Sequence, residues 1–288
     1  MKFDRRLTPA RSDLAAAHLE GKVEAARFVA GQRMQVAAPV ADLKGAPSPE
    51  AALDTQALAG EIATVYERRE GWAWAQLEND SYVGYLPEHA LAENIVASTH
   101  RVASRATFVY PAANMKLPVV ETLPFGAAVA IERIEGDFAK LSRSGFVFTR
   151  HLAAREKNET DFVAVAESML GAPYLWGGKT PAGIDCSGLV QAALAACGRQ
   201  APRDTDMQAA GLGENLPVTD DLSHVRRGDL VFWKGHVGIM RDAATLLHAN
   251  GHHMLVASEP LAQARARIAV NSFGAIVAIK RLAPQAGA

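Results

Sequence analysis

The chain has 288 residues, of which 49% are hydrophobic and 21% charged, and its formal net charge is −1. These values are ordinary for a soluble globular protein of one to three domains with a sizeable core. They argue against a nucleic-acid partner, because no basic stripe appears. No apolar run approaches the roughly 18 residues of a membrane span, so we expect no membrane partner either.

Residues 1–32 form an N-terminal segment to which the sequence assigns no role. A short helix is predicted over residues 12–18, with Ser12 or Asp13 as its N-cap. A secretory signal would need a basic start followed by roughly 7–15 apolar residues. Polar residues instead continue as far as Asp13, so we expect a cytoplasmic protein.

Residues 33–95 show short runs of alternating apolar and polar residues, at 62–66, 72–77 and 82–86. Turn-forming residues separate these runs, namely Glu70-Gly71 and residues 79–81. Such a pattern predicts a small antiparallel barrel or sandwich.

Residues 96–154 repeat that pattern weakly. The turn Glu70-Gly71 has an echo in Glu135-Gly136, and Gly60 and Gly126 stand at similar distances before the two turns. We therefore predict two tandem barrels of one kind, with a pair of unrelated β modules as the alternative.

Residues 155–288 form the third predicted region, which begins with a charged helical start at 156–159. Helices and loops come first and strands follow, so the expected fold class is α+β. A second helix is predicted over residues 187–196, with Gly198 as its stop signal. Cys186 would then lie at or just before the helix N-terminus, where the helix dipole stabilises a thiolate.

Two cysteines occur, Cys186 and Cys197, one at each end of the predicted second helix. Eleven residues of helix separate them by about 16 Å, which is too far for a disulfide. Two thiols that cannot pair fit a reducing compartment. Cys197 is interpreted as a small core hydrophobe, because the helix around it is rich in alanine.

Two histidines supply a candidate base for Cys186. His236 follows the apolar run 229–233, and His248 comes twelve residues later. If the chain folds back near Asp242, the two histidines become cross-strand neighbours on one face. His236 can then take the proton of Cys186 while His248 orients its ring. The same three residues could instead bind zinc, although no CxxC or HxxxH spacing supports that alternative.

These residues resemble the NlpC/p60 family of papain-like cysteine peptidases, and the β modules resemble bacterial SH3-like domains. The matching motifs are Tyr174-x-Trp176-Gly177-Gly178, Asp185-Cys186-Ser187-Gly188, Pro202-Arg203-Asp204, residues 228–232, residues 235–239 and His248. The resemblance implies a Cys186, His236 and His248 triad on a papain-like fold. It also implies that Tyr174 lies beside the nucleophile and helps to hold the oxyanion.

Two SH3-like domains before such a catalytic domain resemble the γ-D-glutamyl-L-diamino acid endopeptidases that recycle wall peptides. The resemblance implies that a barrel tyrosine, Asp185 and Ser187 bind the free amine of the substrate's L-alanine. Tyr82 is the first choice for that tyrosine and Tyr85 the second. Trp176 and Thr205 complete the predicted substrate-binding residues, and either Glu50 or Asp54 is the candidate barrel acid.

The expected activity is therefore hydrolysis of murein peptides of the form L-Ala-γ-D-Glu-diamino acid, without a metal or organic cofactor. A buried ammonium group requires a carboxylate, so an N-acetylated peptide would leave that carboxylate unpaired and be rejected. Two alternatives remain, an exported hydrolase of intact peptidoglycan and a non-catalytic module that binds wall peptides. The sequence indicates neither the preferred diamino acid, diaminopimelate or lysine, nor the oligomeric state.

Overall fold

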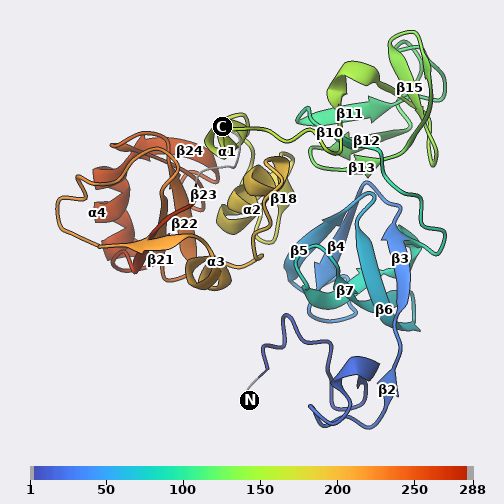
Figure 1. Cartoon of the computed structure of the whole chain (residues 1–288), viewed down its shortest axis with the longest axis horizontal. Coiled ribbons are helices and arrows are strands. Elements are labelled where there is room, and N and C mark those ends of the chain that lie inside the picture. The colour runs from blue at the N-terminus through green and yellow to red at the C-terminus, as the bar shows by residue number, and fades with distance from the viewer. Residues whose placement is uncertain (1–2, 284–288) are drawn as a thin grey trace. The chain divides into compact units, whose positions relative to one another are not determined.

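A computed structural model describes residues 3–283 and contains both helices and strands, in agreement with the predicted α+β class (Figure 1). The chain forms two compact units, Met1–Lys157 and Asn158–Ala288, and each is described by itself. Within residues 3–283, every helix is too short or too polar to span a bilayer.

The N-terminal segment differs from the prediction. Strands β1 (Ala15–Ala16) and β2 (Phe28–Val29) pair in parallel, and one 3-10 turn spans Ala17–Leu19. The predicted helix over residues 12–18 is wrong. Its candidate cap Asp13 accepts hydrogen bonds from the Arg11 guanidinium, at 3.0 and 2.8 Å. That carboxylate therefore pairs with a side chain, and the backbone remains extended.

A seven-stranded antiparallel sheet follows, in the order β5-β4-β8-β7-β6-β3-β9. Its strands are β3 (Gln32–Val36), β4 (Val40–Lys44), β5 (Leu53–Leu58), β6 (Ile62–Arg69), β7 (Trp72–Leu77), β8 (Val83–Pro87) and β9 (Leu91–Ala92), with a 3-10 turn at Glu88–Ala90. The predicted turn Glu70-Gly71 joins β6 to β7, and both of its residues have positive φ. Alternate side chains of the sheet meet in one apolar core, which includes Tyr82.

The second β region holds three small sheets, ordered β13-β10-β17, β11-β12 and β14-β15-β16. Its strands are β10 (His100–Val102), β11 (Ala106–Val109), β12 (Glu121–Pro124), β13 (Ala128–Val129), β14 (Ile131–Glu135), β15 (Phe138–Leu141), β16 (Phe146–Phe148) and β17 (Leu152–Ala154), with a 3-10 turn at Thr149–His151. Gly60 and Gly126 both have a φ of 85°, so the repeated glycines occupy the same type of left-handed turn.

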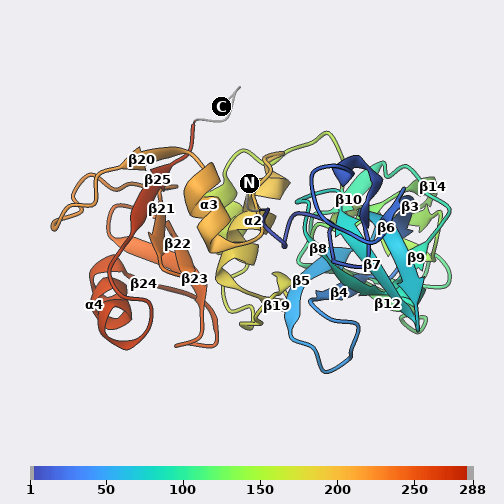
Figure 2. The same cartoon turned by 90° about the horizontal axis from the view of Figure 1, so that it is seen from below.

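The second unit is built on a six-stranded sheet, in the order β20-β25-β21-β22-β23-β24. Its elements are α1 (Phe162–Glu167), β18 (Lys179–Thr180), β19 (Gly183–Ile184), α2 (Cys186–Ala196), α3 (Thr205–Gly211), β20 (Glu214–Leu216), β21 (Leu230–Trp233), β22 (His236–Met240), β23 (Thr245–Asn250), β24 (Leu255–Pro260), α4 (Leu261–Asn271) and β25 (Ala278–Arg281). The sheet lies between α4 on one side and α2 on the other (Figures 1 and 2).

The helix boundaries of the second unit follow local capping. The predicted start at 156–159 is wrong, because Asp161 caps α1 by accepting the N–H groups of Val163 and Ala164. The second predicted helix is confirmed. It spans Cys186–Ala196, and Gly198 adopts the left-handed conformation expected of a stop signal.

Candidate active site

Cys186 is the first residue of α2, and Asp185 is the N-cap. The Asp185 Oδ1 atom accepts the N–H of Gly188 at 2.7 Å, which satisfies an amide that has no partner inside the helix. A Cβ on Gly188 would overlap the carbonyl oxygen of Gly178, so the loop before the helix can approach only a glycine. The predicted position of Cys186 at the helix start is confirmed.

The thiol of Cys186 is buried, and this burial raises its pKa to about 12. The negative charge of Asp185 adds to the increase, whereas the backbone N–H of Val237 and the charge of Arg203 oppose it. The lowering that we expected from the helix dipole is therefore outweighed. Cys186 rests as a thiol at neutral pH, and nucleophilic attack requires a base to remove its proton.

His236 lies directly before Val237, the residue whose N–H hydrogen bonds to the Cys186 sulfur. Its ring stacks on Phe273, with centroids 5.4 Å apart and planes 8° apart, and Trp233 flanks it at 5.6 Å. Two aromatic neighbours restrict the plane of the imidazole. Burial lowers the pKa of His236 to about 3, so its ring is neutral and can accept a proton.

His248 is fully buried on β23 and hydrogen bonds to His236, as the predicted fold-back requires. Ile239 pairs with Leu247, and this register sets the two histidines diagonally on one face of the sheet. The His236 Nε2 and His248 Nδ1 atoms are 2.8 Å apart. Because Nε2 of His236 is engaged, Nδ1 is the ring nitrogen that can exchange a proton with Cys186.

Two residues that the sequence analysis missed extend this chain. Glu259 on β24 lies with Oε1 2.8 Å from Nε2 of His248, and Arg267 on α4 forms an ion pair with the same oxygen. Glu259 pairs across the sheet with Leu246, two residues from His248. A strand predicted over residues 255–260 would have revealed this neighbour, but the sequence analysis placed none there.

A buried ion pair lies under the start of α2. Arg203, whose exposed fraction is 1%, donates to both oxygens of Asp185 at 3.0 and 2.7 Å and to the Ser187 hydroxyl at 2.8 Å. The N–H of Gly177 also donates to Asp185, at 2.8 Å. The network ties the glycine loop to the helix and balances the charge beside the nucleophile. Arg203 belongs to the motif Pro202-Arg203-Asp204, but no local signal in the sequence indicates that it pairs with Asp185.

The other predicted residues of this unit surround the helix start. Tyr174 is half-buried, and burial together with the nearby charges of Cys186 and Asp185 raises the pKa of its phenol. The predicted role of the Tyr174 hydroxyl, to help hold the oxyanion, stays a prediction. Trp176 is 66% exposed, and Thr205 is the first residue of α3. The substrate contacts of all three stay predictions.

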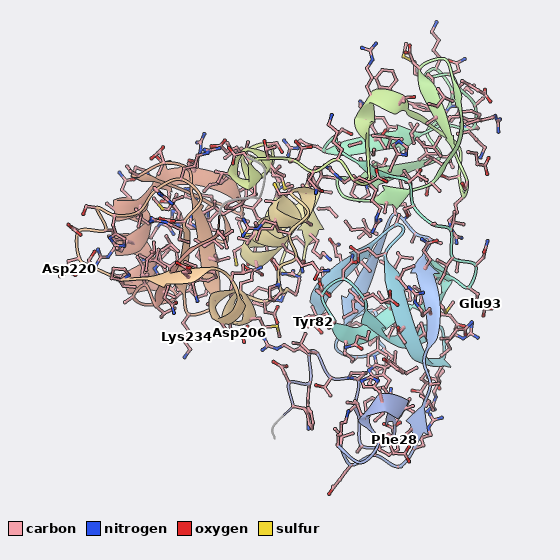
Figure 3. All side chains as sticks on the ribbon, in the orientation of Figure 1. Phe28, Tyr82, Glu93, Asp206, Asp220 and Lys234 are labelled. Carbon is pink, nitrogen blue, oxygen red and sulfur yellow. The ribbon has the colours of Figure 1, made fainter. Side chains whose placement is uncertain are left out.

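The predicted barrel residues lie in the first unit. Tyr82, labelled in Figure 3, packs in the core of the seven-stranded sheet. The hydroxyl of Tyr85 accepts a hydrogen bond from Arg11 at 2.8 Å. Glu50 is exposed and accepts the Ser48 hydroxyl at 2.9 Å, and Asp54 lies on β5. Their part in substrate binding, together with that of Asp185 and Ser187, stays a prediction.

The structure does not support the zinc alternative. Within residues 3–283, no three His, Cys, Asp or Glu side chains are grouped so that they could hold a metal ion. His236 and His248 point ring nitrogens at each other 2.8 Å apart, which is a geometry for sharing a proton.

Comparison with known proteins gives two family matches. The NlpC/P60 family matches residues 171–268, and the bacterial dipeptidyl-peptidase SH3 domain matches residues 43–91. A γ-D-glutamyl-L-lysine dipeptidyl-peptidase of Bacillus subtilis is 26% identical over 223 residues, which cover 68% of this chain and 72% of the relative. Dipeptidyl-peptidase 6 of Lysinibacillus sphaericus is 37% identical over 89 residues, which are 31% of each chain.

Solved structures support the fold. An NlpC/P60 family protein from Bacillus cereus aligns with 88% of this chain and all of its own, with a TM-score of 0.70 and 17% identity. An NlpC/P60 endopeptidase from Photobacterium damselae aligns with 86% of this chain and 71% of its own, with a TM-score of 0.62 and 14% identity. Residues 171–268 thus form a domain of the NlpC/P60 family, a family of cysteine peptidases, and residues 43–91 form a bacterial dipeptidyl-peptidase SH3 domain.

Proposed function

We propose that this protein is a cysteine endopeptidase that cuts the γ-D-glutamyl–L-diamino acid bond of short murein peptides with a free N-terminal L-alanine. The observations that carry the proposal are the position of Cys186 at the start of α2 and the buried hydrogen bond between His236 on β22 and His248 on β23. The γ-glutamyl specificity is supported by the names of relatives in Bacillus subtilis and Bacillus cereus, both γ-D-glutamyl-L-lysine dipeptidyl-peptidases.

Acylation begins with Cys186 as a neutral thiol and His236 as a neutral imidazole. Both shifts in pKa, upward for Cys186 and downward for His236, favour a thiol beside a neutral imidazole. Nδ1 of His236 takes the thiol proton as the sulfur attacks the γ-glutamyl carbonyl carbon. The backbone N–H of Cys186 and the hydroxyl of Tyr174 are the proposed donors to the oxyanion.

Collapse of the tetrahedral intermediate breaks the amide bond, and His236 returns its proton to the amine of the leaving diamino acid. The remaining L-Ala-D-Glu group is bound to the Cys186 sulfur as a thioester. Water then attacks the thioester with His236 as base, and this step frees the dipeptide and regenerates the thiol. One water molecule is consumed for each bond cut.

Selection for a free amine is proposed to rest on Asp185 and Ser187, which lie on either side of Cys186 at the start of α2. Arg203 already occupies both oxygens of Asp185, so a substrate ammonium would share that carboxylate with Arg203. An acetyl group would remove the positive charge that Asp185 attracts and would add bulk at the start of α2. This requirement would restrict the enzyme to peptides already released from the wall.

The test is a mass-spectrometric time course of the wild-type protein with L-Ala-γ-D-Glu-diaminopimelate, its lysine counterpart, their N-acetylated forms and intact peptidoglycan. We expect L-Ala-D-Glu and the free diamino acid from the free peptides. The acetylated peptides should react at least about 10²-fold more slowly. Equal rates for free and acetylated peptides would refute amine recognition. Release of fragments from intact peptidoglycan would favour a wall hydrolase, and absence of all cleavage would favour a binding module.

A further inference from the structure

A chain of hydrogen bonds begins at His236 and ends at the ion pair between Glu259 and Arg267. His236 bonds to His248, His248 bonds to Glu259, and Glu259 forms an ion pair with Arg267. Each of the two histidine links is 2.8 Å long. The Glu259 side chain is 12% exposed, so water competes little for its oxygens. Four side chains from β22, β23, β24 and α4 therefore form one linear network.

A carboxylate at one end of such a network determines where every proton in it lies. Ionised Glu259 can only accept, so Nε2 of His248 must carry a hydrogen. A neutral His248 then has its lone pair on Nδ1 and must accept from Nε2–H of His236. The neutral His236 ring consequently has its lone pair on Nδ1, the nitrogen required for removing the proton of Cys186.

We propose that Glu259, held by Arg267, is a positioning residue that sets the tautomers of His248 and His236 so that Nδ1 of His236 can act as the base. The proposal rests on the proposed peptidase function. Glu259 touches neither the substrate nor the sulfur, so it acts through the two rings. In metal sites, a carboxylate that accepts a hydrogen bond from the far ring nitrogen of a metal-binding histidine also sets its tautomer, and losing it typically costs about 10- to 100-fold in affinity or activity.

The charged groups around the two rings come from several elements. His248 faces His236 and Glu259, and the charges of Arg267 on α4 and His253 after β23 also act on it. Glu259 raises the pKa of both histidines, while Arg267 lowers both. Removing only the carboxylate therefore lowers both pKa values, and protonation of the base then requires a more acidic solution. The acidic limb of kcat/KM should move to lower pH.

The kinetic test compares Glu259→Gln and Glu259→Leu with wild type on L-Ala-γ-D-Glu-diaminopimelate. The leucine variant, which cannot accept a hydrogen bond, should lose about 10²-fold in kcat with little change in KM. The glutamine variant should retain more activity, because its amide oxygen can still accept from Nε2–H of His248. Its acidic limb should move down by at least about half a pH unit.

Glu167→Gln is the matched control, because Glu167 also pairs with an arginine of this unit, Arg241, at 2.8 Å. It should leave kcat and the pH profile unchanged. A loss of kcat in Glu259→Leu of less than twofold, or an equal loss in the control, would overturn the proposal. An acidic limb of the kcat/KM profile that stays at the wild-type pH in Glu259→Gln would also overturn the proposal.

A second readout is independent of cleavage. Long-range ¹⁵N–¹H spectra of the full-length Cys186→Ala protein report directly which nitrogen of each histidine carries the proton. We expect Nε2–H on both His236 and His248, and a mixture of tautomers on His248 after the further change Glu259→Leu. Identical tautomers in the two proteins would overturn the proposal. If these spectra appear but the wild-type protein cuts none of the peptides, only the proposed function is refuted.

Discussion

Replacing Cys186 with alanine is expected to lower kcat by about 10⁵-fold or more while the protein stays folded. Alanine removes the sulfur that forms the thioester, and no other described side chain of the site can replace it as nucleophile. Alanine keeps the Cβ atom and favours a helix, so we expect α2 to lose little stability. Initial rates on L-Ala-γ-D-Glu-diaminopimelate measure the effect.

Cys197→Ala is the matched control for this prediction. Cys197 is buried at the C-terminal cap of the same helix, and neither it nor Cys186 forms a disulfide. Its replacement removes a sulfur of the same type from a position far along the helix from Asp185. We expect a rate of cleavage close to that of wild type. A similar loss of rate in both variants would show that disturbed packing of α2, and not loss of the nucleophile, lowers the rate.

Replacing Arg203 with methionine is expected to lower the free energy of local unfolding around α2 by about 3–5 kcal/mol. Methionine keeps much of the volume but leaves the buried carboxylate of Asp185 without its cation. Native-state hydrogen exchange of the α2 amides measures this change within the second unit. Adding Asp185→Asn should recover part of the loss, because the uncompensated charge disappears.

Arg265→Met provides the comparison for the buried pair. Arg265 and Asp220 form an exposed ion pair at 3.4 Å in the same unit. Exposed pairs contribute about 0–1 kcal/mol, so the α2 amides should exchange as in wild type. If Arg203→Met changes the exchange no more than Arg265→Met, Arg203 does not hold the helix start in the way described.

Local signals predicted the parts of the site that depend on neighbours in sequence. The start of α2 follows from Asp185 and the glycines around it, and its end follows from Gly198. The meeting of His236 and His248 follows from a two-strand register across a short turn. Each of these features needs only a few adjacent residues to specify it.

The features that were missed depend on how separate loops, strands and helices pack against one another. Arg203 reaches Asp185 from 18 residues away, and Arg267 reaches Glu259 from the following helix. The raised pKa of Cys186 depends on how completely the fold buries it, which a helix-start motif does not reveal. The wrong helix at residues 12–18 had a plausible cap, but Arg11 occupied its carboxylate.

The most direct test of the account uses L-Ala-γ-D-Glu with a diazomethyl ketone in place of the scissile amide. The thiol of Cys186 would displace nitrogen from this analogue and form a stable thioether, whose position peptide mapping identifies. We expect one label per chain, on Cys186, and a rate of labelling that falls sharply when the analogue is N-acetylated. A label on Cys197, or no label on the folded wild-type protein, would contradict it.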